Sequence, residues 1–447
     1  MKKERYTGSV DGTNNTVMFS SDRYNFTFFP TQPFHHGQRY AIPITDEFIL
    51  GTSSAGYKVA IYYGGSREEI PMDFPFTFKS QAYLATETDF HELDIAHFQR
   101  IVFVGGVLNA LREESSVETR LSDNGDRIVE SLSNRLQYSF ACGESNCSVT
   151  IGLLETGSFG LHNYSINNKV CLALSFDKPQ PLSLLHKHYV TVCQLISVMT
   201  NRSENPFEAI YISPPASEPL FHLKKAYVHL QENDSYKTTE FPCISFDDLG
   251  GSLPSILEIM FNSKENEPSY SLGFIPRNDS EAFNITDDTV RALLSSLECE
   301  AYFDSSIGLF QSGELEYLCG MVKSVVRHHR KKNKGKPLLS DGTYSVIHGS
   351  IKNWSMSAFE KIDFLFHKHE KAIRNYCERY SPMITEEDIR SLVKYRNSIT
   401  HGTYRELTRK LRHTAVVMEV LVYCCFLCRA GMPEETIEEL CASKIGN

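Results

Sequence analysis

The spacing of apolar residues changes along the chain, and this change limits the possible fold more than any other feature. Up to about residue 180, short apolar runs are bounded by clusters of Gly, Ser, Asn and Asp, a pattern typical of β-strands joined by turns. From Thr286 onward, apolar residues recur every three or four positions, the spacing of amphipathic helices. The sequence therefore predicts the α+β class: a β-rich N-terminal domain followed by an all-α helical bundle.

Four apolar runs define the expected strands of the N-terminal part. They are expected to form a sandwich or a barrel-like sheet, and they lie at Tyr40–Ile44, Val59–Tyr63, Ile101–Val104 and Val170–Phe176. Helical spacing then predicts an amphipathic helix at Leu182–Asn201 and a short helix at Leu253–Phe261. A strand is expected between them, at Glu208–Ser213.

A polar, turn-rich stretch at residues 268–284 separates this part from the helical one. We therefore expect one domain at residues 1–283 and a second at residues 284–447. Thr286 is a favourable N-cap for the first bundle helix, because the two aspartates that follow suit its positive N-terminal end. Further helices are expected from Gly313 into Arg327–Lys336, at Ser355–Tyr380, from Thr385, at Arg405–Arg429 and from Pro433.

The charge of the chain is unevenly distributed. The formal net charge is −10, but residues 323–412 contain 20 Lys and Arg against 9 Asp and Glu, a balance of +11. The rest contains 25 basic and 46 acidic residues, a balance of −21. Contact with RNA is therefore expected in the basic segment, where the candidate phosphate-binding residues are Arg327, Arg330, Lys331 and Lys332. A solvated helix end remains the alternative explanation of that run.

Length and composition are those of an ordinary globular protein. A chain of 447 residues is expected to form two or three domains, and its hydrophobic content is 41%. The first residues carry positive charge without a following apolar run, so no secretory signal is expected. The apolar stretch Ala415–Cys428 is too short to span a bilayer. With the twelve cysteines interpreted as free thiols, we expect a cytoplasmic protein without membrane contact.

One stretch late in the bundle combines residues that suit RNA cleavage. Arg396 and Asn397 follow a buried stripe in the fourth helix, and His401 precedes Gly402, a residue that favours the left-handed end of a helix. Arginine offers a phosphate a permanent cation in bidentate geometry, and histidine can move a proton near neutral pH. Arg396 and His401 are therefore the candidate catalytic residues of a metal-independent endoribonuclease that needs no cofactor.

The spacing of this motif is weak evidence by itself. Roughly two Arg-x(4–6)-His matches are expected by chance in a chain with this many arginines and histidines. A surface arginine followed by a helix-capping histidine is a structural explanation that stays open. In a straight helix, residues five apart differ by about 140° and about 7.5 Å, so Arg396 and His401 would not share a face. Unwinding at Gly402, or a dimer interface, would bring such groups to one phosphate.

A family resemblance adds to this reading of the residues. The stretch from about Thr286 resembles a HEPN domain, a helical bundle marked by Arg-x(4–6)-His, here Arg396-Asn397-x-x-x-His401. In such domains a polar residue commonly follows the arginine directly, so the resemblance implies Asn397 as a third candidate catalytic residue. The preceding region is similar in its order of elements to the N-terminal domain of ApeA-type anti-phage proteins. The shared order is a β-rich front, a Leu-rich helix, a strand, and a linker into a helix with Leu-Leu-x-x-Leu-Glu, here Leu293–Glu298. The resemblance covers nearly the whole chain.

The resemblance carries several functional expectations. It implies metal-independent cleavage of cellular or phage RNA, with tRNA as a candidate target, in abortive anti-phage defence that halts translation. It also implies a homodimer or a higher homo-oligomer through the HEPN domain, with active sites shared between copies. The N-terminal domain would then sense a phage-derived trigger or restrain the nuclease. The alternative is a HEPN-like module that binds RNA or protein without catalysis.

Other residue clusters give weaker signals. Glu298 and Glu300 on the first bundle helix could orient the catalytic pair, but we interpret them as exposed helix carboxylates. The cysteines between Cys424 and Cys428 are interpreted as core residues. The sequence contains no P-loop, dinucleotide fingerprint or serine-nucleophile elbow. No metal is expected, because companion ligands at metal-site spacing are missing from the histidine pairs His35–His36, His186–His188 and His367–His369.

Overall fold

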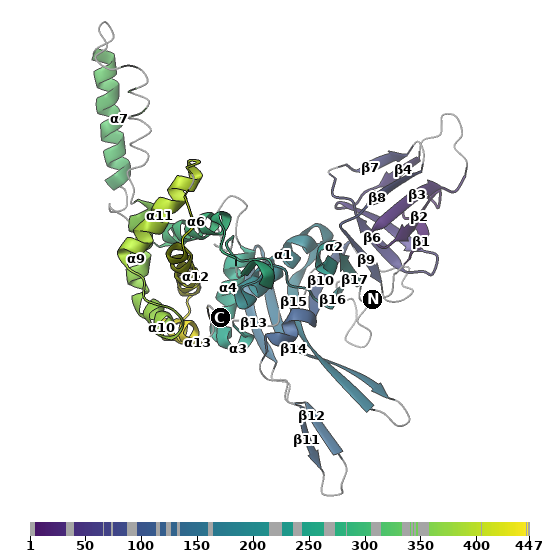
Figure 1. The fold of residues 1–447 in the computed structure, drawn as a ribbon. Helices are drawn as coiled ribbons and strands as arrows, with labels where there is room; N and C mark the ends of the chain where they lie inside the picture. The colour runs from purple at the N-terminus through teal and green to yellow at the C-terminus, as the bar shows by residue number, and fades with distance from the viewer. Residues whose placement is uncertain are drawn as a thin grey trace. The chain divides into compact units, whose positions relative to one another are not determined.

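The computed structural model divides the chain into two compact units (Figure 1). The first unit is Met1–Ser269 with Ile275–Asn284, and the second is Tyr270–Phe274 with Ile285–Asn447. An antiparallel sheet region precedes a helical region, which confirms the α+β class. The structure describes residues 5–32, 40–65, 67–72, 75–86, 96–112, 117–121, 127–131, 135–159, 164–213, 226–235, 244–262, 273–282, 284–304, 314–332, 340, 343, 346, 357–403, 405–443 and 445.

The first unit is built on antiparallel strands. These strands are β1 (Thr7–Val10), β2 (Val17–Asp22), β3 (Asn25–Pro30), β4 (Tyr40–Pro43), β5 (Phe48–Ser53), β6 (Lys58–Tyr62), β7 (Glu69–Met72), β8 (Phe76–Lys79), β9 (Ala82–Thr86), β10 (His97–Val104), β11 (Val117–Leu121), β12 (Arg127–Ser131), β13 (Leu136–Cys142), β14 (Ser145–Phe159), β15 (Tyr164–Pro181), β16 (Ala209–Ser213) and β17 (Ala226–Leu230). One sheet has 13 strands in the order β13-β14-β15-β10-β16-β17-β9-β6-β5-β1-β2-β3-β8. β11 pairs with β12, and β4 pairs with β7.

Alternating burial explains why these segments form strands. In β2, Val17 and Phe19 are buried while Met18 between them is partly exposed, which is the period of two expected when one sheet face meets a core. Phe26 and Phe28 of β3 join the same core. The four strands predicted from apolar runs are present as β4, β6, part of β10 and part of β15.

The arrangement of the strands differs from the sequence-based expectation. Of the two expected forms, the sandwich is not seen, because β10 pairs with β15 on one side and with β16 on the other and joins the main strands into one continuous sheet. A closed barrel is not seen either among the described strands, since the end strands β13 and β8 do not pair with each other. β14 and β15 form a long hairpin, with pairing from Cys147–Phe176 to Phe159–Tyr164. The sequence pattern did not indicate this length.

Helices α1 (Leu185–Thr200) and α4 (Leu253–Phe261) pack beside the β13–β15 part of the sheet. His188 on α1 lies between the rings of Phe176 and Phe261, with centroids 4.9 and 5.4 Å away. The bounds of α4 match the sequence-based prediction, whereas α1 starts three residues late, because Leu182–Leu184 form a 3₁₀ turn. The remaining short helices of the unit are α2 (Gln231–Ser235), α3 (Phe246–Leu249) and α5 (Asp279–Ala282).

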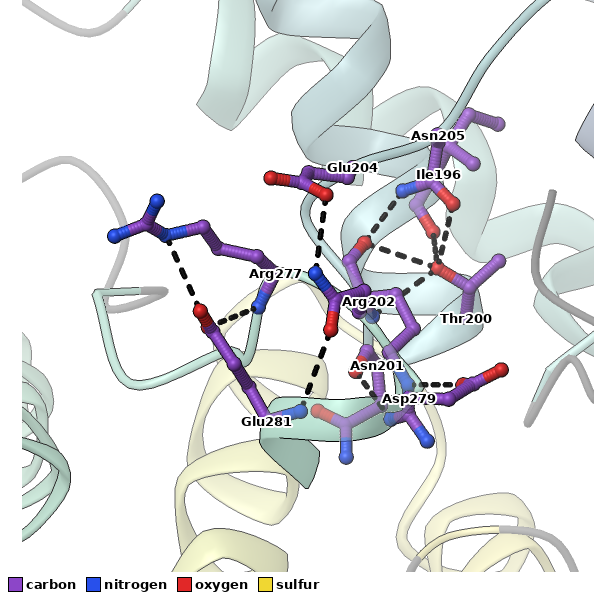
Figure 2. A network of polar contacts seen from close by, with 10 residues as sticks. Ile196, Thr200, Asn201, Arg202, Glu204, Asn205, Arg277, Asp279 and Glu281 are labelled. Atoms are coloured by element: carbon purple, nitrogen blue, oxygen red, sulfur yellow. Dashed lines mark hydrogen bonds and ion pairs between the residues drawn. The ribbon is translucent and has the colours of Figure 1, made fainter. Parts of the chain in front are cut away.

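A polar network fixes the end of α1 to the last segment of the first unit (Figure 2). The Arg202 Nε donates to Asp279 Oδ1 at 2.7 Å, and Asn278 Nδ2 donates to Glu204 Oε2 at 3.2 Å. The backbone N–H of Glu204 donates to the Arg277 carbonyl at 2.9 Å. Because residues 275–284 come just before the second unit in the chain, these contacts anchor the start of the connection to the bundle.

The second unit is a helical bundle. Its described helices are α6 (Asp287–Phe303), α7 (Glu314–Lys332), α9 (Ala358–Lys368), α10 (Glu370–Tyr380), α11 (Glu386–Thr400), α12 (Arg409–Arg429) and α13 (Glu434–Ser443). The single helix expected at Ser355–Tyr380 is wrong, since His369 (φ −107°, ψ 21°) interrupts it between α9 and α10. α12 starts at Arg409 instead of Arg405, because Thr408 caps its first turn.

α12 forms the centre of the bundle core. It packs against α6, α9, α10, α11 and α13, and its residues from Val417 to Leu427, Glu419 excepted, are buried. By length and composition this helix is also long and apolar enough to cross a membrane, but 67% of its most apolar window is buried inside the protein. Such burial is what a core helix of a bundle shows.

Candidate active site

The sequence of α11 positions Arg396 near the end of the helix. The helix begins with a capping box, in which the Thr385 backbone N–H donates to Asp388 Oδ2 at 3.0 Å. Ile389 and Leu392 are fully buried, so this face of α11 packs into the bundle. Arg396 is half-buried one turn later, and Asn397 beside it is exposed.

A carboxylate on another helix holds Arg396. Its Nη2 donates to Oε1 of Glu298, on α6, at 2.5 Å, and the two side chains are 20% and 34% exposed. The Nε–H of Arg396 is buried and finds no hydrogen-bond partner in the part of the chain that the structure describes. The buried Nε–H is out of reach of a ligand, but the Nη1 group forms no hydrogen bond with the described residues and the side chain is 20% exposed, so Nη1 can donate to a further acceptor such as a phosphate.

His401 lies just beyond the last turn of α11. The helix ends at Thr400, and His401 is its C-cap, with φ −89° and ψ 11°. Gly402 follows at φ +73°, the left-handed conformation that glycine adopts readily, and the Thr403 N–H donates to the Ser398 carbonyl at 2.9 Å. The His401 ring is exposed and forms no hydrogen bond with the described residues. It is therefore open to a substrate.

Arg396 and His401 are presented by the same helix end but do not touch. Neither a hydrogen bond nor an ion pair joins their side chains, although both residues lie in the described range 357–403. The helix stays regular through Thr400, so the unwinding that would bring the pair together within one copy is not seen. The arrangement offers a cation and a titratable ring on one accessible segment.

Arg291 is a residue of this region that sequence reasoning missed. It lies on α6, and its Nη2 donates to the Ile399 carbonyl at 2.9 Å, while its Nη1 is 3.1 Å from Asp288 Oδ1. The carbonyls in the last turn of a helix lack intrahelical partners, so this bond stabilises the turn that leads into His401. The contact joins residues 108 positions apart, and no local pattern indicates it.

The exposed interpretation of the two glutamates on α6 is wrong. Glu300 is 3% exposed and accepts two hydrogen bonds from Arg429, at 2.8 and 2.9 Å. The Arg429 guanidinium also lies over the ring of Phe303, 4.3 Å from its centroid. Glu298 is partly buried against Arg396. Of the two residues, only Glu298 contacts the candidate catalytic arginine.

The basic run lies on a different helix from Arg396 and His401. It occupies the last turns of α7, where the side chains of Arg327, Arg330, Lys331 and Lys332 are all exposed. Exposure is what phosphate contact requires, and a solvated helix end requires it equally. The structure therefore places these residues on the surface without bringing them into contact with the candidate site.

The described histidine and cysteine clusters do not form a metal-ligand set. Among the described residues, no three His, Cys, Asp or Glu side chains group together in a way that could hold a metal ion. Burial, and then the charge of Lys187, lowers the pKa of His188 to about 4, and burial likewise lowers the pKa of His369 to about 4. Cys424 and Cys425 are buried in α12. His35 and His36 lie outside the described residues.

The comparisons with known proteins add no relative to this picture. No protein-family model, no curated protein and no solved structure matches the chain. The resemblance to HEPN domains and to ApeA-type proteins therefore rests on the residues of this chain, chiefly on Arg396-Asn397-x-x-x-His401.

Proposed function

We propose that the second unit is a HEPN-type, metal-independent endoribonuclease, and that Arg396, Asn397 and His401 form its active site. The observation that carries the proposal is the geometry at the end of α11. Arg396 is anchored by Glu298 through Nη2, its partly exposed side chain leaves Nη1 without a partner among the described residues, and His401 stands exposed just beyond the helix. A cation and a proton-transfer group are the two parts that cleavage by a neighbouring 2′-hydroxyl needs.

The chemistry assigns one role to each residue. Arg396 would bind the non-bridging oxygens of the scissile phosphate and stabilise the charge that develops on them. His401 would take the proton from the 2′-OH as that oxygen attacks phosphorus, or give a proton to the departing 5′-oxygen. The products are a 2′,3′-cyclic phosphate and a 5′-OH. Asn397, exposed beside Arg396, would hydrogen-bond the RNA backbone.

A second copy of the chain would complete this site. Arg396 and His401 do not meet within one copy, and a two-fold axis would add a second pair without further sequence. The apolar residues of α12 between Val416 and Cys428 could in principle form a dimer contact, but most of them are buried inside the bundle. The homodimer of the proposal therefore has to form through another face.

The biological setting of the proposal comes from the resemblance to ApeA-type proteins. The first unit would sense a phage-derived trigger or hold the nuclease inactive. The activated nuclease would cut cellular or phage RNA, with tRNA as a candidate target, and stop translation in the infected cell. The protein would act in the cytoplasm without a cofactor.

Cleavage of total RNA by the purified full-length protein in EDTA tests the proposal. We expect 2′,3′-cyclic phosphate and 5′-OH ends, and at least a hundredfold loss of rate in Arg396→Ala and in His401→Ala. Arg390→Ala is the matched control, because Arg390 lies on the same helix and pairs with Glu386 on the surface. If Arg396→Ala and His401→Ala cleave as fast as Arg390→Ala, the assignment of the site is wrong.

RNA contact by the basic run has its own test. A plot of log K for RNA binding against log salt concentration has a negative slope. Replacing Arg330, Lys331 and Lys332 by alanine should make this slope shallower by roughly two, since about 0.7 counterions are released per contact with single-stranded RNA. An unchanged slope would leave this run as a solvated helix end. Salt-dependent RNA binding without cleavage under any condition would favour the non-catalytic HEPN-like module.

A further inference from the structure

The helix α7 exposes an apolar stripe. Tyr317 is 72% exposed, Met321 47% and Val325 63%, and all three belong to the same 19-residue helix. They are four residues apart, so at about 100° per residue they fall within one narrow arc of the helix surface. α12 is of similar length, but its apolar residues are buried. Large exposed apolar side chains in a row mark a surface that contacts another protein, a membrane or a ligand.

The charges of α7 are separated along its length. In sequence, its first turn contains Glu314 and Glu316, and its last two turns contain Arg327 and the basic residues from His329 to Lys332. Two such helices in parallel would place their basic ends side by side, which is unfavourable. In an antiparallel pair centred on Met321, Arg327 and His328 instead lie opposite the acidic start of the other helix, and the basic residues 329–332 extend beyond it. The sequence of α7 is therefore complementary to itself in the antiparallel orientation.

We propose that α7 pairs antiparallel with α7 of a second copy of this chain. Met321 lies near the two-fold axis, and Tyr317 of one copy packs against Val325 of the other. The same register sets position 314 of one helix opposite position 328 of the other, a glutamate against a histidine. The pairing supplies a face for the homodimer and rests on the proposed function only in that a shared active site needs two copies.

The features of α7 fit a second copy better than other partners. RNA would use the lysines and arginines at one end of the helix but gains nothing from an apolar stripe. A helix that lies on a membrane carries basic residues along its whole polar face, whereas those of α7 gather toward one end. Self-pairing uses the stripe and both charged ends. A two-fold pair also uses the same surface of both copies, so no copy of that surface is left unpaired and assembly stops at the dimer.

Disulfide cross-linking of the full-length protein tests the register directly. A disulfide needs Cα atoms within roughly 7 Å, so under mild oxidation Met321→Cys should link two chains across the axis. Val325→Cys alone should not, because its two copies would be about 12 Å apart along the helices. A mixture of Tyr317→Cys and Val325→Cys chains should cross-link with each other. Arg327→Cys, on another face, controls for the native cysteines.

A charge placed in the stripe tests the energetics. Met321→Glu should weaken dimerisation at least tenfold in sedimentation equilibrium. A monomeric wild-type protein at high micromolar concentration overturns the proposal, and so does self-linking of Val325→Cys with none at Met321→Cys. Binding of monomers to anionic phospholipid vesicles that Met321→Glu abolishes would make the stripe a membrane contact. A melting temperature of Met321→Glu below that of the wild type at a concentration where both are monomeric would make the stripe part of the chain's own core, because loss of dimerisation cannot then account for the change.

The outcomes separate this pairing from the nuclease. Cross-links in the expected register without RNA cleavage would contradict the proposed nuclease and support the pairing of α7. RNA cleavage by a protein that lacks these cross-links would contradict the pairing and support the nuclease.

Discussion

Two glutamates on α6, Glu298 and Glu300, each bind an arginine from another helix, but the two ion pairs differ in exposure. The side chains of Glu300 and Arg429 are 1% and 17% exposed, and two hydrogen bonds join them. Glu298 and Arg396 are 34% and 20% exposed, and one hydrogen bond joins them. The first pair uses the arginine to satisfy a buried carboxylate. The second leaves the arginine donors that a ligand can use.

Helix α6 can therefore contribute to stability through Glu300 and position a candidate functional residue through Glu298. A buried charge has lost its hydration, so its partner cannot leave without a large penalty. In the second pair the glutamate is partly exposed and therefore hydrated, so the pair contributes less to folding and its arginine can exchange partners at lower cost. We therefore expect Arg429 to be needed for folding and Arg396 to be needed for activity.

The largest expected effect is on folding. Arg429→Ala should lower the free energy of unfolding of the bundle by about 3–5 kcal/mol, because it leaves the carboxylate of Glu300 buried without its main partner. Urea denaturation measures the change. Adding Glu300→Gln to this variant should recover part of the loss. Arg374→Ala is the control, since Arg374 pairs with Glu370 on the surface, and should change stability by no more than about 0.5 kcal/mol.

A contrast of the same kind separates His188, which is buried in the first unit, from the exposed His401. The pKa of His188 is lowered to about 4 in the folded protein, from 6.5. Between pH 6.5 and 4, the unfolded chain therefore binds a proton that the folded chain does not, and stability falls as pH falls. Above pH 6.5 the ring is neutral in both states, and this contribution vanishes.

Replacing His188 by phenylalanine should remove this pH dependence. From pH 7.5 to pH 5, the wild type should lose about 2 kcal/mol more than His188→Phe in the free energy of unfolding of the first unit. Phenylalanine suits the site, because the rings of Phe98, Phe176 and Phe261 already surround His188. Parallel pH profiles of the two proteins would show that His188 does not resist protonation.

A smaller effect on folding is expected at Arg396. Arg396→Ala should change the free energy of unfolding by no more than about 1 kcal/mol, because Glu298 remains accessible to water after the arginine is removed. The same variant should lose RNA cleavage. A loss of stability as large as that of Arg429→Ala would contradict the comparison and make Arg396 a structural residue.

How much the sequence could predict depends on how local each feature is. The start of α6 at Thr286 and the bounds of α4 follow from capping residues and spacing within a few positions, and they were predicted. The pair Glu298–Arg396 joins residues 98 positions apart, and the pair Glu300–Arg429 joins residues 129 apart. No local pattern indicates which charges meet, so the glutamates were misread as exposed.

Strand order in the sheet is non-local in the same way. Apolar runs between turn-forming residues predicted strands such as β6 and part of β10, but the neighbours of β10 come from positions 164–181 and 209–213. For the candidate site, the motif indicated Arg396 and His401 correctly as neighbours of a helix end. Two contacts join this helix end to α6: Glu298 accepts from Arg396, and Arg291 donates to the Ile399 carbonyl. No sequence pattern indicates either contact.

The smallest expected effect tests whether the site is shared between copies. Arg396→Ala and His401→Ala chains should each be inactive alone. If one copy supplies Arg396 and the other His401, each mixed dimer contains one intact site and one site that lacks both groups. Random mixing of equal amounts makes half of the dimers mixed, so the mixture should recover roughly a quarter of wild-type cleavage. If each copy worked alone, no mixed dimer would hold an intact site, and the mixture would stay inactive. Arg396→Ala mixed with the double variant Arg396→Ala/His401→Ala is the control, since no pairing of those chains restores the arginine.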